Sequence, residues 1–115
     1  MQRSNQASRA YESASRNRSQ RDQEADVFRH ATAVLKSARQ ATGIQRVRAL
    51  ADNRRLWLTV NDLMRDPANA LPEATRAGIV SISMSVQREM EQDAPDFGFL
   101  ISINENFIAG LSGQP

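Results

Sequence analysis

Two short breaks that contain proline divide the second half of this 115-residue chain, and they constrain its fold more than any other feature. The first break runs from Asp66-Pro67 to Pro72, and the second is Asp93-Ala94-Pro95-Asp96. Proline pushes the preceding residue out of the α region but is well tolerated in the first turn of a helix. Each break therefore predicts one helix end and one helix start.

Apolar residues recur at three- and four-residue spacing around these breaks, which is the pattern of amphipathic helices. The spacing predicts a helix from about Asp26 that ends near Gly43, a natural C′ residue, and a second from about Ile44 to Arg65. A third begins with Pro72 at its first position, and the last runs from about Pro95 to Leu111. No segment resembles a pair of strands. The predicted fold class is all-α, a small single-domain bundle of about four helices.

Residues 1–22 differ from the rest of the chain in composition. They are rich in Ser, Asn, Gln and Arg, and apart from Met1 their only large apolar side chain is Tyr11. Such a segment buries too little surface to offset the entropy lost on ordering. We expect residues 1–22 to form a mobile, polar and basic arm, and residues 23–113 to form the helical domain.

Composition argues against several classes of protein. The amino terminus lacks the apolar region of a signal peptide and no run approaches the ~20 apolar residues of a membrane span, so we expect a soluble, unexported protein with no membrane contact. With no cysteine and the single histidine His30, a disulfide framework or a metal site is not expected. The crowded carboxylates of Glu89, Glu91, Asp93 and Asp96 do not converge on one helix face. We therefore predict neither catalytic residues, nor a cofactor, nor a small-molecule substrate.

Charge is distributed unevenly along the chain. Residues 1–55 hold 12 of the 15 basic residues and 5 of the 13 acidic ones, and 14 of the basic residues are arginine. Arginine suits bidentate contacts with carboxylate or phosphate. The alternatives are an acidic partner, attraction between the two halves of the chain, or charge that is merely solvated.

A helical wheel separates the two arginines of the sequence NRRLW, residues 53–57. Asn53, Arg54 and Asn61 fall within the apolar arc that contains Trp57, whereas Arg55 falls on the opposite side. Buried polar groups need hydrogen-bond partners, for which the 66–72 turn and the acidic half are candidates. We therefore expect structural roles for the side chains inside the arc and leave Arg55 as a candidate for partner binding.

The last two predicted helices carry apolar residues beyond one stripe. Asn104 lies within the apolar arc of the last helix and is expected to be a hydrogen-bonded core amide. Outside the main arcs lie Val80 and Met84 of the third helix and Phe99 and Ile103 of the last. Surplus apolar positions indicate either a helix packed on two sides or a surface that binds a partner.

Several motifs in combination resemble one known family. They are NRRLW, Asp66 to Pro72 (DPANALP, with Pro67), Arg76, the stretch from Ile79 to Ser83, Ile103-Asn104, and Gly110-Leu111. In this order they resemble the flagellar biosynthesis regulator family FlaF, over about residues 24–112.

The resemblance implies a function that composition does not. Members of the family are small cytoplasmic helical proteins of flagellated bacteria that are needed to make and export flagellin. They are thought to bind flagellin as secretion chaperones and to oppose a second regulator, FlbT, which controls flagellin messenger RNA. Flagellin is thus the expected partner. The alternative is regulation of the messenger RNA, through an FlbT-like regulator or by direct binding, for which the candidate residues are Arg16, Arg18, Arg21, Arg46, Arg48 and Arg55.

Overall fold

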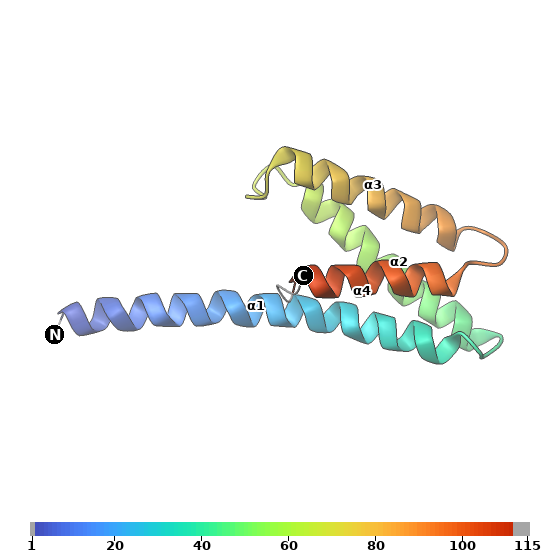
Figure 1. The fold of residues 1–115 in the computed structure, drawn as a ribbon, viewed down its shortest axis with the longest axis horizontal. Coiled ribbons are helices and arrows are strands. Elements are labelled where there is room, and N and C mark those ends of the chain that lie inside the picture. The colour runs from blue at the N-terminus through green and yellow to red at the C-terminus, as the bar shows by residue number, and fades with distance from the viewer. Residues whose placement is uncertain (1, 112–115) are drawn as a thin grey trace.

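The protein folds into four α-helices, as the computed structural model shows for the backbone of residues 2–111 and the side chains of residues 7–9, 11 and 22–111. The helices are α1 (Gln2–Ala38), α2 (Ile44–Arg65), α3 (Glu73–Met90) and α4 (Phe97–Leu111) (Figure 1). No strand occurs in the described part of the chain. The predicted all-α class is therefore confirmed.

Helix α1 begins at Gln2, well before the start near Asp26 that the apolar spacing predicts. It runs without a break through the expected boundary between an arm at residues 1–22 and a domain at residues 23–113. Residues 1–42 contain neither proline nor glycine, so nothing in the sequence stops the helix from extending beyond its packed portion. Whether the arm is mobile stays a prediction, and residues 112 and 113 lie outside the described residues.

The loops follow the predicted breaks with small shifts. Helix α1 ends at Ala38, and Gly43, predicted as the C′ residue of that helix, instead adopts a φ of 63° at the N-cap of α2. Glycine tolerates this left-handed conformation because it lacks a Cβ. Pro72 occupies the N-cap of α3 rather than its first position. Helix α4 starts at Phe97, two residues later than predicted, because the Asp96 carboxylate accepts the amide of Phe99 at 3.1 Å and caps the helix.

The helices pack as a chain of neighbours around one core. Helix α1 contacts both α4 and α2, and α2 contacts α3. Figure 1 shows α4 lying antiparallel along the second half of α1, while the first half of α1 extends beyond the other helices. The structure is accordingly elongated, with extents of 63 × 29 × 24 Å.

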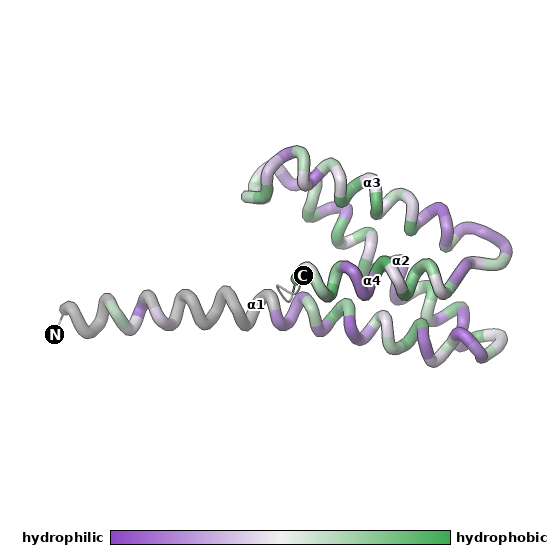
Figure 2. Tube along the Cα trace, viewed as in Figure 1, coloured by the Kyte–Doolittle hydropathy of each residue, from purple (hydrophilic) through white to green (hydrophobic). Residues whose placement is uncertain are grey.

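Apolar residues from all four helices form the core. Figure 2 shows that hydrophobic residues are most frequent along α4 and in parts of α3. The fully or nearly fully buried members are Phe28, Leu35, Ala38, Ala49, Trp57, Val60, Val86, Met90, Phe97, Leu100 and Ile101. Among the helices described here, none combines the length and apolar character that crossing a membrane requires.

Candidate functional site: a buried polar network and two apolar surfaces

Three aromatic rings from three helices meet in the core. The rings of Phe28 in α1 and Phe107 in α4 stack with centroids 5.6 Å apart. Trp57 of α2 meets both edge-on, at 5.7 Å from Phe28 and 4.9 Å from Phe107. These are favourable geometries for aromatic pairs, and Trp57 is fully buried. The indole thus holds α1, α2 and α4 together.

A directional chain of hydrogen bonds begins at the same indole. Trp57 Nε1 donates to Asn104 Oδ1 at 2.9 Å, and Asn104 Nδ2 donates to Asn53 Oδ1 at 2.8 Å. Asn53 Nδ2 then contacts the sulfur of Met90 at 3.5 Å. Both asparagines are fully buried, so their desolvation is offset only by these bonds. These hydrogen bonds link α2, α4 and α3, and they pair the buried polar groups of Trp57, Asn104 and Asn53 with one another.

Helix α3 adds a second polar contact to α2. Ser83, which is fully buried, donates its hydroxyl to the backbone oxygen of Trp57 at 3.2 Å. Its oxygen in turn accepts a hydrogen bond from Gln87 Nε2 at 2.9 Å. Every described buried side-chain nitrogen and oxygen has a partner. Ser83, Gln87 and Met90 were not expected in this network, because nothing in the spacing of the sequence indicates which helix faces Asn53.

The structure corrects the assignment of Arg54 to the buried side of α2. Arg54 is exposed, as is Arg55, and Asn61 is half-buried with its carbonyl accepting Arg65 Nε at 3.4 Å. The buried row of α2 is Ala49, Asn53, Trp57 and Val60. Arg54 follows Asn53 by about 100° around the helix, which carries its side chain out of this buried row.

Replacing Arg54 by alanine should therefore change the free energy of unfolding by less than about 0.5 kcal/mol, as for most exposed sites. The matched change Asn53→Ala should cost about 1–3 kcal/mol, because it leaves the buried amide of Asn104 without its acceptor. Urea denaturation followed by Trp57 fluorescence measures both. A loss above about 1 kcal/mol for Arg54→Ala would show that its guanidinium stabilises the fold after all.

The 66–72 turn was a candidate source of hydrogen-bond partners for Asn53 and Arg54. Its hydrogen bonds are instead made within the turn, with the end of α2 and with Arg76. The Asp66 carboxylate accepts the amide of Ala68 at 2.9 Å, and Asn69 donates to the carbonyl of Leu63 at 2.9 Å. Arg76 Nε donates to the carbonyl of Leu71 at 3.1 Å. Pro67 and Pro72 are exposed and act through their backbone conformation. This part of the motif therefore shapes the connection between α2 and α3.

The second proline-containing break uses its carboxylates in the same way. Glu89 accepts the amide of Asp96 at 3.2 Å, while Asp96 caps α4. Near the same end of the bundle, the Arg46 guanidinium lies 4.2 Å from the centre of the Phe97 ring and donates to the carbonyl of Arg39 at 2.8 Å. Arg46 is half-buried and joins the start of α2 to the start of α4.

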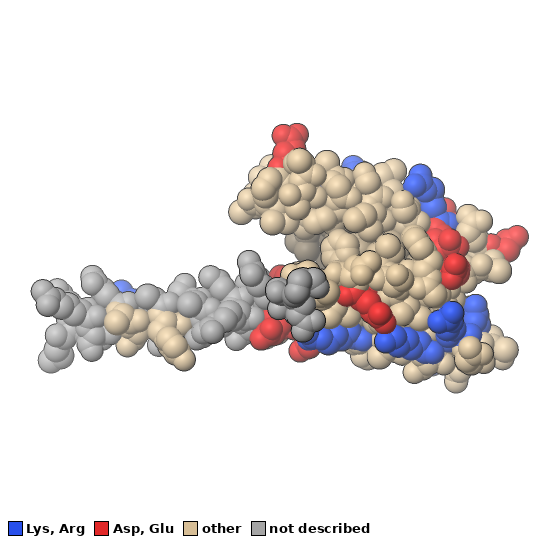
Figure 3. Space-filling model, viewed as in Figure 1, with Lys and Arg blue, Asp and Glu red and all other residues tan. Residues whose placement is uncertain are grey.

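The four surplus apolar residues lie on two helices that pack on different neighbours. Met84 of α3 is exposed, Val80 is half-buried, and Phe99 and Ile103 of α4 are half-buried against the core. Between Arg76 and Arg88 of α3 no residue is charged, and α4 has Glu105 alone. In Figure 3 the atoms over α3 and α4 are largely uncharged, whereas charged groups gather along α1 and at the loops. We call Val80, Met84, Phe99 and Ile103 the α3–α4 surface.

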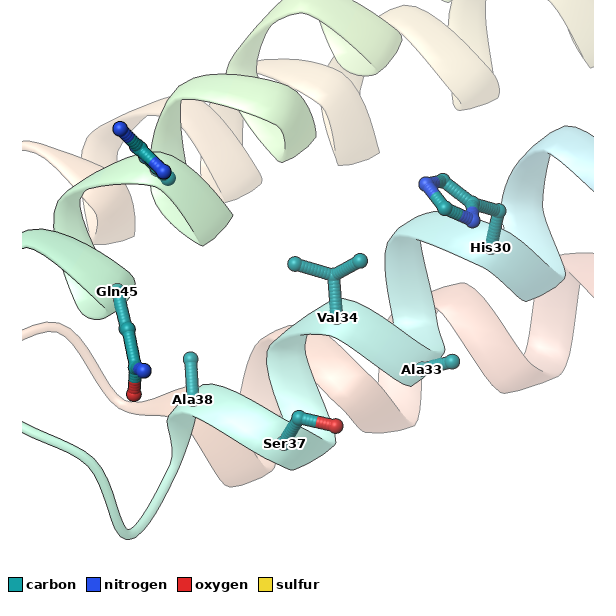
Figure 4. Close-up of a pocket in the computed structure, with 7 residues that line it drawn as sticks. His30, Ala33, Val34, Ser37, Ala38 and Gln45 are labelled. Atoms are coloured by element: carbon teal, nitrogen blue, oxygen red, sulfur yellow. The ribbon is translucent and has the colours of Figure 1, made fainter.

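A groove between α1 and α2 was not expected from the sequence. It consists of three pockets of about 390, 250 and 240 Å³ that share lining residues: His30 belongs to the first two, and Val27, Leu56 and Thr59 to the last two. Figure 4 shows the first pocket, where His30, Val34 and Ala38 of α1 lie toward the gap that Gln45 of α2 also borders. The α1–α2 groove shares no residue with the α3–α4 surface. Arg55, the candidate for partner binding, lines the middle pocket of the groove.

An exposed ion pair joins the basic and acidic halves of the chain. Lys36 Nζ lies 2.8 Å from Glu105 Oε1, and both side chains are about half exposed. Exposed pairs of this kind contribute about 0–1 kcal/mol. Attraction between the halves through this pair is therefore a minor part of the stability of the fold.

A comparison with known families identifies the same family that the sequence motifs resemble. The family described as flagellar protein FlaF matches residues 7–111, which is almost the entire chain. No curated protein matches this sequence, and no solved structure does. The NRRLW stretch and Asn104 meet in the buried network, and the DPANALP turn connects two of its helices. On the extent of this match, the chain belongs to the FlaF family, whose role lies in flagellar biogenesis or its regulation.

Proposed function

We propose that the protein acts without catalysis, by binding flagellin as a secretion chaperone and so promoting the synthesis and export of flagellin. The observation that carries this proposal is the scarcity of charge on α3 and α4: no residue between Arg76 and Arg88 is charged, and Glu105 is the only charged residue of α4. Met84 is 48% exposed, and Phe99 and Ile103 are half-buried against the core. A helix can bury an apolar stripe of its own against such residues, in the way that amphipathic helices bind grooves in other proteins.

Flagellin suits this surface because its terminal regions are helical and need protection before export. A chaperone for such a segment must offer apolar contacts without closing around the substrate, because the substrate has to be released. The rigid network beneath the surface, from Trp57 through Asn104 to Asn53, supports this role because it fixes α3 and α4 relative to α2. Pre-organised binding residues lose less entropy on association.

Titration calorimetry with purified flagellin tests the proposal. We expect stoichiometric binding that Met84→Glu weakens at least about tenfold, which corresponds to about 1.4 kcal/mol. Met84 is exposed, so a charge there should leave the fold intact. The matched control is Leu58→Glu, at a comparably exposed leucine on α2 that lies outside the α3–α4 surface and the α1–α2 groove.

The outcomes separate the function from the surface. If the unaltered protein gives no binding to flagellin, the chaperone function is wrong. If binding occurs but Met84→Glu and Leu58→Glu retain the same affinity, flagellin binds elsewhere on the molecule. A charged substitution at Phe99 extends the test to α4, with circular dichroism used to verify that this half-buried site still folds.

The alternative function is regulation of flagellin messenger RNA, directly or through an FlbT-like regulator. Direct binding would use basic residues, but Arg46 is half-buried over Phe97 and hydrogen-bonded within the fold, and the side chains of Arg16, Arg18 and Arg21 lie outside the described residues. RNA binding predicts an affinity that falls steeply with salt, because neutralised phosphates release counterions. A gel shift with the messenger RNA at low salt decides this alternative.

A further inference from the structure

The α1–α2 groove combines an apolar half with charges at its ends. In its third pocket, Val27 and Leu63 are 56% and 53% exposed, and they flank Leu56, Phe107 and Leu111. Apolar side chains that lie together at this exposure are typical of surfaces that bind a partner. The residues come from α1, α2 and α4, so that the packing of three helices holds the pocket in shape.

The two ends of the groove carry opposite charge. The first pocket is lined by the cation of Arg48 and by no carboxylate, whereas the third is lined by the carboxylate of Glu24 and by no cation. Between them, the middle pocket contains Asp52 and Arg55, whose charges balance. Complementarity therefore requires an occupant with an acidic end over Arg48 and a basic end over Glu24.

The length of the groove matches a short helix. Its lining on α1 extends from Glu24 to Ala38, which at 1.5 Å per residue is about 21 Å, or about four helical turns. The polar amino-terminal part of α1 is a poor occupant, because Tyr11 is its only large apolar residue after Met1. Figure 4 views the first pocket of the groove from a side where α1 and α2 lie in front of the other helices.

We propose that the α1–α2 groove is a second docking site, which binds an amphipathic helix of a partner protein. That helix is about four turns long, buries an apolar stripe against Val27, Leu56 and Leu63, and places acidic residues over Arg48 and basic residues over Glu24. The site is distinct from the α3–α4 surface, with which it shares no residue. A partner in the groove and flagellin on α3–α4 can thus bind the same molecule together.

A synthetic peptide tests the proposal with the full-length protein. The probe is a fluorescent, end-blocked helix of 16 residues, with leucines at helical spacing on one face, three glutamates at one end and three lysines at the other. We expect saturable binding in fluorescence anisotropy at low ionic strength. Leu63→Glu should weaken it at least about tenfold, because a leucine burial of about 1.5–3 kcal/mol is lost.

A charge swap distinguishes recognition from a general loss of structure. Arg48→Glu and Glu24→Lys should each weaken peptide binding about fivefold, since exposed charge pairs contribute up to about 1 kcal/mol. The double variant Arg48→Glu/Glu24→Lys should restore much of the affinity, because the peptide can then bind in the reverse direction. Arg54→Glu, an exposed charge change on the same helix outside the groove, is the matched control and should leave binding unchanged.

Three results would overturn the proposal. The first is no peptide binding up to about 1 mM, and the second is equal weakening by Arg54→Glu and by the groove variants. The third is a concentration-dependent dimer in analytical ultracentrifugation that Leu63→Glu abolishes, because a second copy of the chain would then cover the groove. Flagellin binding by Leu63→Glu should stay normal, so that failure of this site does not count against the proposed function.

Discussion

Substitution of Trp57 by alanine should lower the free energy of unfolding by about 3–5 kcal/mol, the largest effect we expect from any single change. The indole is fully buried, contacts the rings of Phe28 and Phe107, and donates the hydrogen bond that begins the polar network. Alanine leaves a cavity at the junction of three helices and an unpaired oxygen on Asn104. Domains are typically stable by about 5–15 kcal/mol, so this loss would remove a large part of the stability.

Urea denaturation followed by circular dichroism measures this effect, because the only tryptophan is removed by the change. Trp57→Phe divides the loss into parts: it keeps an aromatic ring but removes the N–H group, and should cost about 1–3 kcal/mol. Leu58→Ala is the control, since Leu58 is the next residue on α2 and is exposed. A cost below about 1 kcal/mol for Trp57→Ala would mean that the aromatic cluster does not hold the bundle together.

The helices could be predicted well where the sequence contains residues that stop them. Helix α2 has the predicted bounds Ile44–Arg65, because Gly43 precedes it and Asp66-Pro67 follows. The start of α1 could not be predicted, because no stop signal precedes its apolar stripe and helix propensity alone is a weak guide. Local signals thus determine helix ends only where glycine, proline or a capping side chain is present.

The buried polar residues could be predicted in part. Their place on a helical wheel indicates that Asn53 and Asn104 lie on apolar arcs, but it does not identify their partners, which come from helices distant in sequence. The wheel also places Arg54 within the arc, but the structure leaves it exposed, because the packing of the neighbouring helices determines how wide the buried part of α2 is. The α1–α2 groove is a property of helix packing as well, because Val27 and Leu63 belong to apolar arcs that no helix covers at that point.

The strongest interaction between two sites should be that of Asn53 and Asn104. Asn104→Ala alone leaves two buried groups unpaired, Trp57 Nε1 and Asn53 Oδ1, and should cost about 3 kcal/mol at 1–3 kcal/mol for each group. Asn53→Ala leaves the amide nitrogen of Asn104 unpaired and should cost about 2 kcal/mol.

The double variant Asn53→Ala/Asn104→Ala should cost about 1–2 kcal/mol less than the sum of the two single changes, because each single change strands a group that the double variant removes. Urea denaturation of all four proteins, followed by Trp57 fluorescence, closes the cycle. Pairing Asn53→Ala with Lys36→Ala, an exposed site on α1, gives the control cycle, which should be additive within about 0.5 kcal/mol. Additivity in both cycles would contradict the network, because two amides that satisfy each other cannot be lost independently.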